Sequence, residues 1–183
     1  MTGPTWNSVR VAPPRVQSVR EFVALVAGGK TARKRAVQSG GALVGALSGA
    51  AGAEARAVAE RIASESRVRL IAVSLRAVGS KYASETERNL DAVFASADRA
   101  DSMLYCADAD TLFGRAPATS GNAEVAASIL KRVDGLSGVV LFAFATAPPT
   151  LDAAFLRRLH YIVALQAPDG SSRDSLWRAL LTG

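Results

Sequence analysis

Five short apolar runs, separated by stretches of helical periodicity, constrain the fold of this chain more than any other feature. The runs are continuously apolar rather than alternating, which is typical of strands that are covered on both faces. Strands of this kind, joined by helices, form parallel sheets. The sequence therefore predicts an α/β fold with a five-stranded parallel sheet sandwiched by helices, its strands at residues 42–47, 69–73, 103–106, 139–145 and 161–165.

Helices are expected between these strands. Ser18 and Glu21 match a capping box, which predicts a helix from residue 18 that ends at Gly28 and Gly29. Apolar positions at helical spacing predict four more helices, at residues 53–63, 85–100, 121–134 and 171–181.

Ligands of open parallel sheets bind beyond the carboxyl ends of the strands. In this chain those ends lie near Gly49, Ala107 and Thr146. We therefore expect any ligand site at these three positions.

The first strand leads into a small-residue turn at 48–52 and then into a helical stretch. Nucleotide-binding αβ proteins hold phosphate on backbone N–H groups in such a layout, although a plain strand–helix connection has the same outline. A Walker A loop reads G-x-x-x-x-G-K-[ST]. From Gly49 the chain reads G-A-A-G-A-E-A-R, so Glu54, Ala55 and Arg56 stand where the Gly, the Lys and the hydroxyl residue are needed.

A second short motif, Gly29-Lys30-Thr31, spells the end of a Walker A loop. It follows a stretch with helical rather than strand periodicity, and Ala24 stands where the first Gly would be. We expect no phosphate site there.

The formal net charge of +6 lies entirely within residues 1–40, which hold seven basic residues against one acidic residue. We expect a basic N-terminal arm and helix over residues 1–40 and an αβ core domain over residues 41–183. A basic leader can contact nucleic acid. No aromatic residues alternate with these charges, so a solvated basic segment is the expected interpretation.

The remaining composition excludes several classes of protein. A single cysteine, Cys106, and a single histidine, His160, leave no disulfide framework and no His/Cys metal site, so both residues are expected to be structural. No apolar run reaches the ~18 residues needed to span a bilayer, and the N-terminus has no signal-peptide core. We therefore expect no membrane contact and a cytoplasmic location.

Three stretches closely resemble segments of the AAA+ ATPase family. Residues 80–90, S-K-Y-A-S-E-T-E-R-N-L, resemble the family's S-K-Y-x-G-E-T-E-x-N-L segment. Residues 104–114, L-Y-C-A-D-A-D-T-L-F-G, resemble its Walker B strand, L-F-F-D-E-A-D-x-L-F-G, and residues 151–159, L-D-A-A-F-L-R-R-L, resemble its arginine-finger segment. The resemblance runs from about Gly41 to Leu181 and implies a P-loop NTPase fold of the AAA+ large-subdomain type, without the helical lid that usually follows.

The chain departs from the family at the positions of nucleotide chemistry. Ala107 stands where the family has the Asp that holds Mg²⁺ through water, and Asp108 replaces the Glu that polarises the attacking water. The sensor Asn falls on Thr146 or Ala147. Phosphoryl transfer depends on positioning and electrostatic stabilisation, so these losses predict a pseudo-ATPase that binds no cofactor and no metal. The degenerate nucleotide-binding positions are Gly49, Gly52, Ala55, Arg56, Ala107 and Thr146.

Motif residues that serve neighbouring subunits are retained. Arg157 and Arg158 match the arginine fingers, which in the family reach the nucleotide of the adjacent protomer. Lys81 and Tyr82 match the pore loop, which grips substrate polypeptide. The resemblance thus implies AAA+ protomers as partners in a homo- or hetero-oligomeric ring and a polypeptide substrate, and we expect no nucleic-acid partner.

Three functions remain open. The favoured one is a non-hydrolysing structural or regulatory subunit of an AAA+ assembly. The second is an active ATPase in which Arg56 reaches the phosphates of ATP and Asp108 binds Mg²⁺. Arg56 stands one position after the Walker A lysine position, and its planar guanidinium is a poor substitute for the lysine ammonium. The third is a nucleic-acid or protein binding module on an αβ scaffold.

Overall fold

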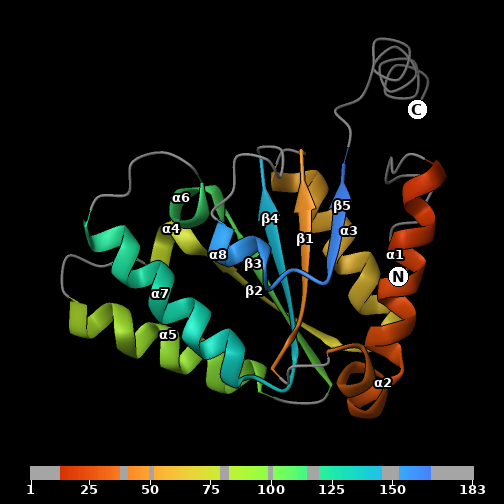
Figure 1. Ribbon diagram of the computed structural model, residues 1–183, viewed down its shortest axis with the longest axis horizontal. Helices are drawn as coiled ribbons and strands as arrows, with labels where there is room; N and C mark the ends of the chain where they lie inside the picture. The colour runs from red at the N-terminus through yellow and green to blue at the C-terminus, as the bar shows by residue number, and fades with distance from the viewer. Residues whose placement is uncertain are drawn as a thin grey trace, which may run out of the picture.

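A computed structural model describes residues 13–37, 41–49, 52–78, 83–98, 101–114, 120–145 and 153–165. Five parallel strands form one sheet in the order β2-β3-β4-β1-β5 (Figure 1). The predicted parallel sheet is confirmed, and every strand bound lies within one residue of its predicted position. The strands are β1 (Leu43–Ser48), β2 (Arg69–Ser74), β3 (Ser102–Ala107), β4 (Val139–Phe144) and β5 (Tyr161–Ala164).

Helices cover both faces of the sheet (Figure 1). One face packs against α1 (Pro13–Ala27) and α3 (Gly52–Ser66). The opposite face packs against α4 (Leu75–Val78), α5 (Ala83–Ala97), α6 (Asp110–Phe113), α7 (Ser120–Gly135) and α8 (Ala153–Leu156). Within the described residues, no helix has the length and apolar character needed to cross a membrane.

The central strand β1 explains why its sequence is apolar without alternation. Leu43 and Leu47 belong to the core beneath α1 and α3, whereas Val44 and Ala46 belong to the core beneath α5 and α7. All four side chains are at most 3% exposed. Successive side chains of a strand point to opposite faces, so a strand buried on both faces must be apolar at every position.

The N-terminal helices differ from the sequence prediction. Helix α1 begins at Pro13, so Ser18 lies inside the helix and the predicted capping box at its start is wrong. Proline is well suited to a first helical position, because its fixed φ is already helical and its missing N–H would have no helical partner there. The predicted glycine stop is confirmed, since α1 ends at Ala27 and Gly29 has a φ of 71°.

Helix α2 (Gly29–Ala36) was not predicted from the sequence. It contains Gly29-Lys30-Thr31 in its first turn and follows another helix rather than a strand. The expectation that this motif lacks the strand–turn–helix layout of a phosphate loop is therefore confirmed.

Helix α1 shares a core with the sheet. Val19, Phe22 and Val26 are at most 2% exposed and lie in the same apolar cluster as β1 and α3. The ring of Phe22 lies 5.6 Å from that of Tyr161 on β5. The charge boundary at residue 40 therefore does not coincide with a break in packing.

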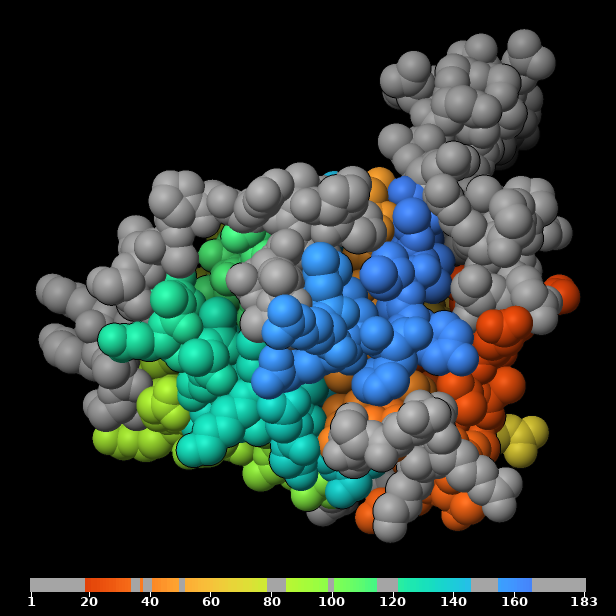
Figure 2. Space-filling view, in the orientation of Figure 1, coloured from red at the N-terminus to blue at the C-terminus, as the bar shows by residue number. Residues whose placement is uncertain are grey.

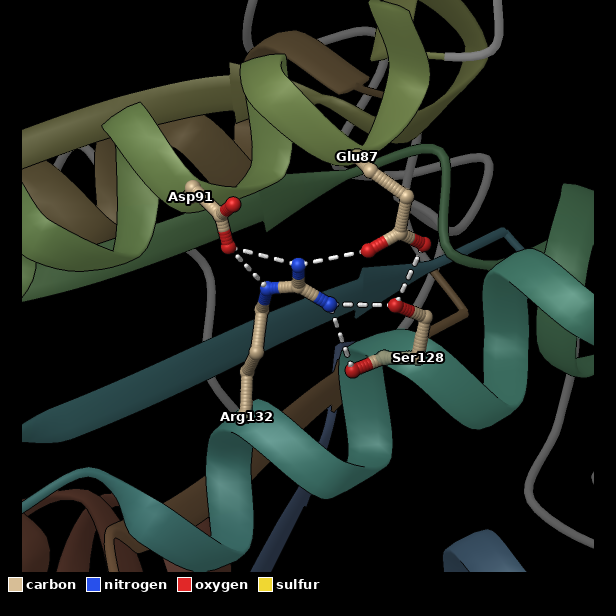
Figure 3. A network of polar contacts seen from close by, with 4 residues as sticks. All are labelled: Glu87, Asp91, Ser128 and Arg132. Atoms are coloured by element: carbon tan, nitrogen blue, oxygen red, sulfur yellow. Dashed lines mark hydrogen bonds and ion pairs between the residues drawn. The ribbon is translucent and has the colours of Figure 1, made fainter. Parts of the chain in front are cut away.

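A polar network joins α5 to α7 on the surface (Figure 3). The guanidinium of Arg132 on α7 donates to Glu87 Oε2 at 2.6 Å and to Asp91 Oδ1 at 2.6 and 3.1 Å, both on α5. It also donates to the carbonyl oxygen of Ser128 at 3.2 Å and to its hydroxyl, which in turn donates to Glu87 Oε1 at 2.8 Å. The Arg132 side chain is 19% exposed, so this network is more ordered than an isolated surface ion pair.

Replacing Arg132 by Met should lower the free energy of unfolding by about 1–3 kcal/mol, because several charge-assisted hydrogen bonds are lost together. For a chain of this size, each kcal/mol corresponds to a fall in Tm of about 2–4 °C. Thermal unfolding at pH 7 measures the effect, with Lys131→Met on the exposed face as the matched control.

The Arg132 contribution should depend on pH. Hydrogen bonds from Arg132 and Ser128 lower the pKa of Glu87. The stabilisation is therefore present above the ordinary glutamate pKa and is lost as the pH falls through the lowered one. Equal Tm values for Arg132→Met and wild type at pH 7 would contradict this account.

Candidate functional site

The carboxyl ends of β1, β3 and β4 meet at one edge of the sheet. The N–H of Gly49, after β1, donates to the carbonyl of Phe144 at 3.0 Å, and the N–H of Ala109, after β3, donates to the carbonyl of Ala143 at 3.0 Å. The structure thus brings the predicted positions Gly49 and Ala107 to the same edge. Thr146 lies outside the described residues.

Gly49 is the position at this edge where only glycine fits. Its φ is 84°, in the left-handed region that side chains disfavour. A Cβ added there would also lie 2.6 Å from the carbonyl oxygen of Leu165, and the N–H of Leu165 donates to the Ser48 carbonyl at 2.6 Å. The exit of β5 therefore packs directly on the turn after β1.

The first turns of α3 carry the altered Walker A positions. Gly52 is the first residue of the helix, and a Cβ there would meet nothing within 4 Å. Ala55, at the position of the Walker A lysine, is 2% exposed and belongs to the core cluster beneath α3. Arg56 is exposed, and its Nε donates to Glu60 Oε1 at 2.9 Å. The lysine position thus holds a buried methyl group, and the adjacent cation lies along the outer surface of α3.

The end of β3 places a carboxylate beside β2. Asp108 follows Ala107, the last residue of the strand, and has a φ of 57°. This conformation is tolerated by Asp more readily than by most side chains. Asp108 Oδ2 accepts a hydrogen bond from Ser74 Oγ at 2.5 Å, and its carbonyl accepts from the N–H and the hydroxyl of Thr111 at 3.1 and 2.8 Å. The Asp108 side chain is therefore tied to the end of β2.

Two residues at this edge were not singled out from the sequence. Asp110 Oδ2 accepts a hydrogen bond from the N–H of Ala145 at 2.7 Å, which fixes the exit of β4 relative to α6. Ser74 is the hydroxyl partner of Asp108. Asp110 matches the third acidic position of the Walker B segment, a signal that could have identified it. No sequence signal pointed to Ser74.

The core behind this edge contains buried hydroxyl groups. Tyr105 is 2% exposed, and burial, followed by the charge of Asp108, raises its pKa to about 12. Its hydroxyl and that of Ser48 have no hydrogen-bond partner within the described residues. At neutral pH the Tyr105 hydroxyl therefore stays protonated and adds no charge to the edge.

At the matched Walker positions that the structure describes, the side chains differ from the donor set that Mg-ATP uses in this kind of site. Such a site uses a lysine ammonium on the phosphates and a hydroxyl and a carboxylate around Mg²⁺. Ala55 and Ala107 have no polar side-chain atom, and Arg56 is turned toward Glu60. The part of the chain that the structure describes also contains no group of three or more His, Cys, Asp and Glu side chains placed to hold a metal ion.

Helix α8 and the turn after it carry the two candidate arginine fingers. Phe155 on α8 is fully buried, with its ring centroid 4.6, 4.9 and 5.2 Å from those of Phe113, Phe142 and Phe144. The N–H of Arg158 donates to the Phe155 carbonyl at 3.0 Å. This aromatic cluster fixes the backbone from which both arginines project.

The two arginines have different surroundings. Arg158 donates from Nε to Asp134 Oδ1 at 2.9 Å and from Nη2 to Asp134 Oδ2 at 2.8 Å. Arg157 is exposed, and no carboxylate of the described residues pairs with it. Lys81 and Tyr82, the candidate pore-loop residues, lie outside the described residues.

His160 and Cys106 have the structural roles predicted for them. The His160 ring atom Nδ1 accepts a hydrogen bond from the backbone N–H of Val44 at 3.2 Å, and the backbone N–H of His160 donates to the Val44 carbonyl at 2.9 Å. Burial lowers the pKa of His160. Cys106 is 1% exposed within β3, where burial raises the pKa of its thiol.

Comparison with known proteins identifies relatives of this fold. The sequence pattern of the family described as "ATPase family associated with various cellular activities (AAA)" matches residues 47–167. The ATPase family gene 2 protein of Saccharomyces cerevisiae (strain ATCC 204508 / S288c) is 32% identical over 135 residues, which cover 69% of this chain. The match covers 17% of the length of that yeast protein.

Two solved structures share the fold. The FIGL-1 AAA domain in complex with ADP has a TM-score of 0.73 at 20% identity, covering 100% of this chain and 62% of that one. A chain of the E. coli MS115-1 HORMA:CdnC:Trip13 complex has a TM-score of 0.64 at 16% identity, covering 94% and 69%. The matched family pattern, together with the five-stranded parallel sheet, shows that this chain belongs to the AAA family of ATPases and has the large-subdomain fold of its P-loop NTPase core.

Proposed function

We propose that this protein is a non-hydrolysing member of the AAA+ family that acts as a structural or regulatory subunit of an AAA+ assembly. One observation carries the proposal: Ala55 and Ala107 stand at the two charged positions of the nucleotide site, while Arg157 remains exposed at a position that serves a neighbour. A chain with this combination can support a neighbouring site better than its own.

The physical argument concerns the γ-phosphate. Phosphoryl transfer relies on groups that position the phosphates and neutralise their charge. A methyl group at Ala55, buried in the core beneath α3, supplies neither. Glu54, in the first turn of α3, complements the helix macrodipole but repels polyphosphate. Glu54 therefore already places a negative charge at this helix end, which opposes the binding of ATP phosphates.

The alternative of an active ATPase depends on Arg56. Its exposed ion pair with Glu60 is worth only about 0.3–0.5 kcal/mol, so breaking that pair is not the obstacle. The obstacle is direction, because a residue one position later projects about 100° further around the helix. Arg56 leaves α3 on its exposed side, whereas Ala55 occupies the lysine position.

The alternative of a nucleic-acid module depends on the basic N-terminal region. Lys30 on α2 is exposed, but Arg33 is 2% exposed. Burial lowers the pKa of Arg33, as expected for a guanidinium removed from water. At least one charge of this region is therefore not displayed on a surface that could track a phosphate backbone, which favours the subunit proposal.

The partners we propose are other AAA protomers, identical or different, arranged in a ring. Lys81 and Tyr82 would then face the channel of the ring and contact a polypeptide substrate. The E. coli MS115-1 HORMA:CdnC:Trip13 structure is that of a multi-protein complex containing a protein of this fold. This likeness supports an assembly as the setting in which to test the chain.

Mixing the protein with an active AAA relative from the same cell tests the proposal. We expect co-assembly on size-exclusion chromatography and ATP hydrolysis that depends on this chain. Arg157→Ala/Arg158→Ala should lower the hydrolysis rate of the mixture, because an arginine finger supplied in trans is worth about 10³–10⁵ in rate to the site that receives it. Co-assembly should be unchanged.

The matched control is Arg20→Ala, which removes an exposed cation on α1. It should leave both co-assembly and hydrolysis at wild-type values. Absence of co-assembly with any relative, or a double variant that hydrolyses at the wild-type rate, would favour the binding-module alternative instead.

A further inference from the structure

The geometry points to different roles for the two adjacent arginines. We propose that Arg157 is the residue offered to the neighbouring subunit, whereas Arg158 is retained by Asp134 of its own subunit and acts as a positioning residue. This inference rests on the proposed function, and it assigns the contact with the neighbouring subunit to one arginine rather than two.

The Arg158 contact has the form of a specific pair rather than a chance encounter. Two nitrogens of the guanidinium meet the two oxygens of one carboxylate, at 2.9 and 2.8 Å. This bidentate arrangement is the strongest and most directional form of an ion pair. The pairing lowers the pKa of Asp134 and raises that of Arg158.

Asp134 is held on a rigid support. It lies in the last turn of α7, next to Val133, whose carbonyl accepts the N–H of Ala42 at 3.2 Å. Gly41 lies close to the Asp134 backbone: a Cβ added at Gly41 would be 3.1 Å from the carbonyl oxygen of Asp134. The carboxylate that receives Arg158 is therefore fixed relative to the start of β1.

The backbone of Arg158 is fixed as well. It follows Phe155, which is buried in the aromatic cluster, and precedes His160, which exchanges hydrogen bonds with Val44. Figure 2 shows the segment from α8 to β5 (blue) on the surface of the molecule, between α7 (teal) and α1 (orange-red). The pair with Asp134 thus spans from this surface segment to the end of α7.

These contacts make the two arginines unequal as donors to a neighbour. Arg158 can reach a second subunit only by leaving a carboxylate that holds it with two hydrogen bonds. Arg157 is exposed and can bind an anion of the neighbour without such a loss. The pair between Arg158 and Asp134 fixes the turn after α8. The adjacent Arg157 then leaves the subunit in a constant direction.

A charge swap separates the two roles. Arg158→Asp/Asp134→Arg rebuilds the pair in the opposite sense but leaves no cation at position 158. In the mixed assembly, Arg157→Ala should lower hydrolysis at the shared sites by about 10³-fold or more. Arg158→Ala and Asp134→Asn should each lower it by less than about tenfold and by similar factors, because each loses the same pair. The swap should return the rate to within about threefold of wild type.

Thermal unfolding of the isolated chain provides a second readout. Arg158→Ala and Asp134→Asn should lower Tm by similar amounts, and the swap should restore it. A swap that restores Tm but hydrolyses as slowly as Arg157→Ala would show that Arg158 acts in trans and would overturn the inference. So would an Arg158→Ala variant that is slow while Asp134→Asn has wild-type Tm and rate.

The failure of the proposed function gives a different pattern. If co-assembly is absent, or no arginine variant changes the rate of the mixture, the assignment of Arg157 to a neighbour fails together with the subunit proposal. The Tm values of the single variants and of the swap then still decide whether Asp134 holds Arg158. A swap that fails to restore Tm would overturn that part too.

Discussion

A variant carrying five substitutions at the carboxyl edge of the sheet should bind Mg-ATP, whereas the wild type should not. The substitutions are Glu54→Gly, Ala55→Lys, Arg56→Thr, Ala107→Asp and Asp108→Glu. Together they restore the lysine, the hydroxyl and the two Walker B carboxylates of the family. We expect a dissociation constant in the micromolar range, which corresponds to about −8 kcal/mol, measured by calorimetric titration with Mg-ATP.

The physical reason for this expectation is that Gly49 and the start of α3, on either side of the loop, have a suitable backbone. Gly49 has the left-handed φ of a glycine turn, and α3 begins at Gly52 with its N-terminus at the edge of the sheet. Backbone N–H groups at such a helix end can donate to a phosphate, but they do not replace the charge that the Walker side chains supply. The substitutions would therefore add charge to an existing frame.

Two companion variants make the experiment specific. A variant with the other four substitutions but with Ala55 retained should not bind, because the ammonium on the phosphates is missing. Arg56→Thr alone should cost no more than about 0.3–0.5 kcal/mol of stability through its pair with Glu60, and should not bind either. If the variant with all five substitutions folds but does not bind Mg-ATP, the turn after β1 has changed shape.

The sheet could be predicted from the sequence because its physical cause is local in the sequence. A strand buried on both faces, such as β1 or β4, is apolar at nearly every position, and helical segments separate such strands. The stripe of Leu90, Val93, Phe94 and Ala97 on α5 was likewise predictable. Leu90, Phe94 and Ala97 are buried, and Val93 is partly buried against the same core.

The start of α1 was not predictable from its local signals. Ser18 and Glu21 have the spacing of a capping box, but the helix continues upstream to Pro13. A favourable cap sequence does not force a helix to begin where the chain before it can also be helical. Helix α2 was missed because most of its residues are basic or small and give no apolar stripe.

The sequence located candidate residues along the chain, but it gave no information on their contacts. The Walker B resemblance located Asp108, but not its hydrogen bond from Ser74, which is 34 residues away in sequence. The pair between Arg158 and Asp134 joins the turn after α8 to the last turn of α7, between residues 24 apart in sequence. Such pairs depend on how α7 and α8 pack on the sheet, and a single sequence carries no signal for them.

We expect that the wild-type site does not bind Mg-ATP. Micromolar affinity requires about −8 kcal/mol, and charge-assisted hydrogen bonds supply much of it in this kind of site. Ala55 and Ala107 remove the cation and the metal ligand, and Glu54 adds repulsion. We expect their combined loss to amount to several kcal/mol, which moves the dissociation constant to about 1 mM or above.

Calorimetric titration of the wild-type protein with Mg-ATP, and with ATP in excess EDTA, tests this claim most directly. We expect no saturable heat below about 1 mM nucleotide in either titration. Saturable binding at micromolar concentration that disappears when EDTA removes Mg²⁺ would contradict it, and would support an active ATPase in which Arg56 and Asp108 serve the nucleotide.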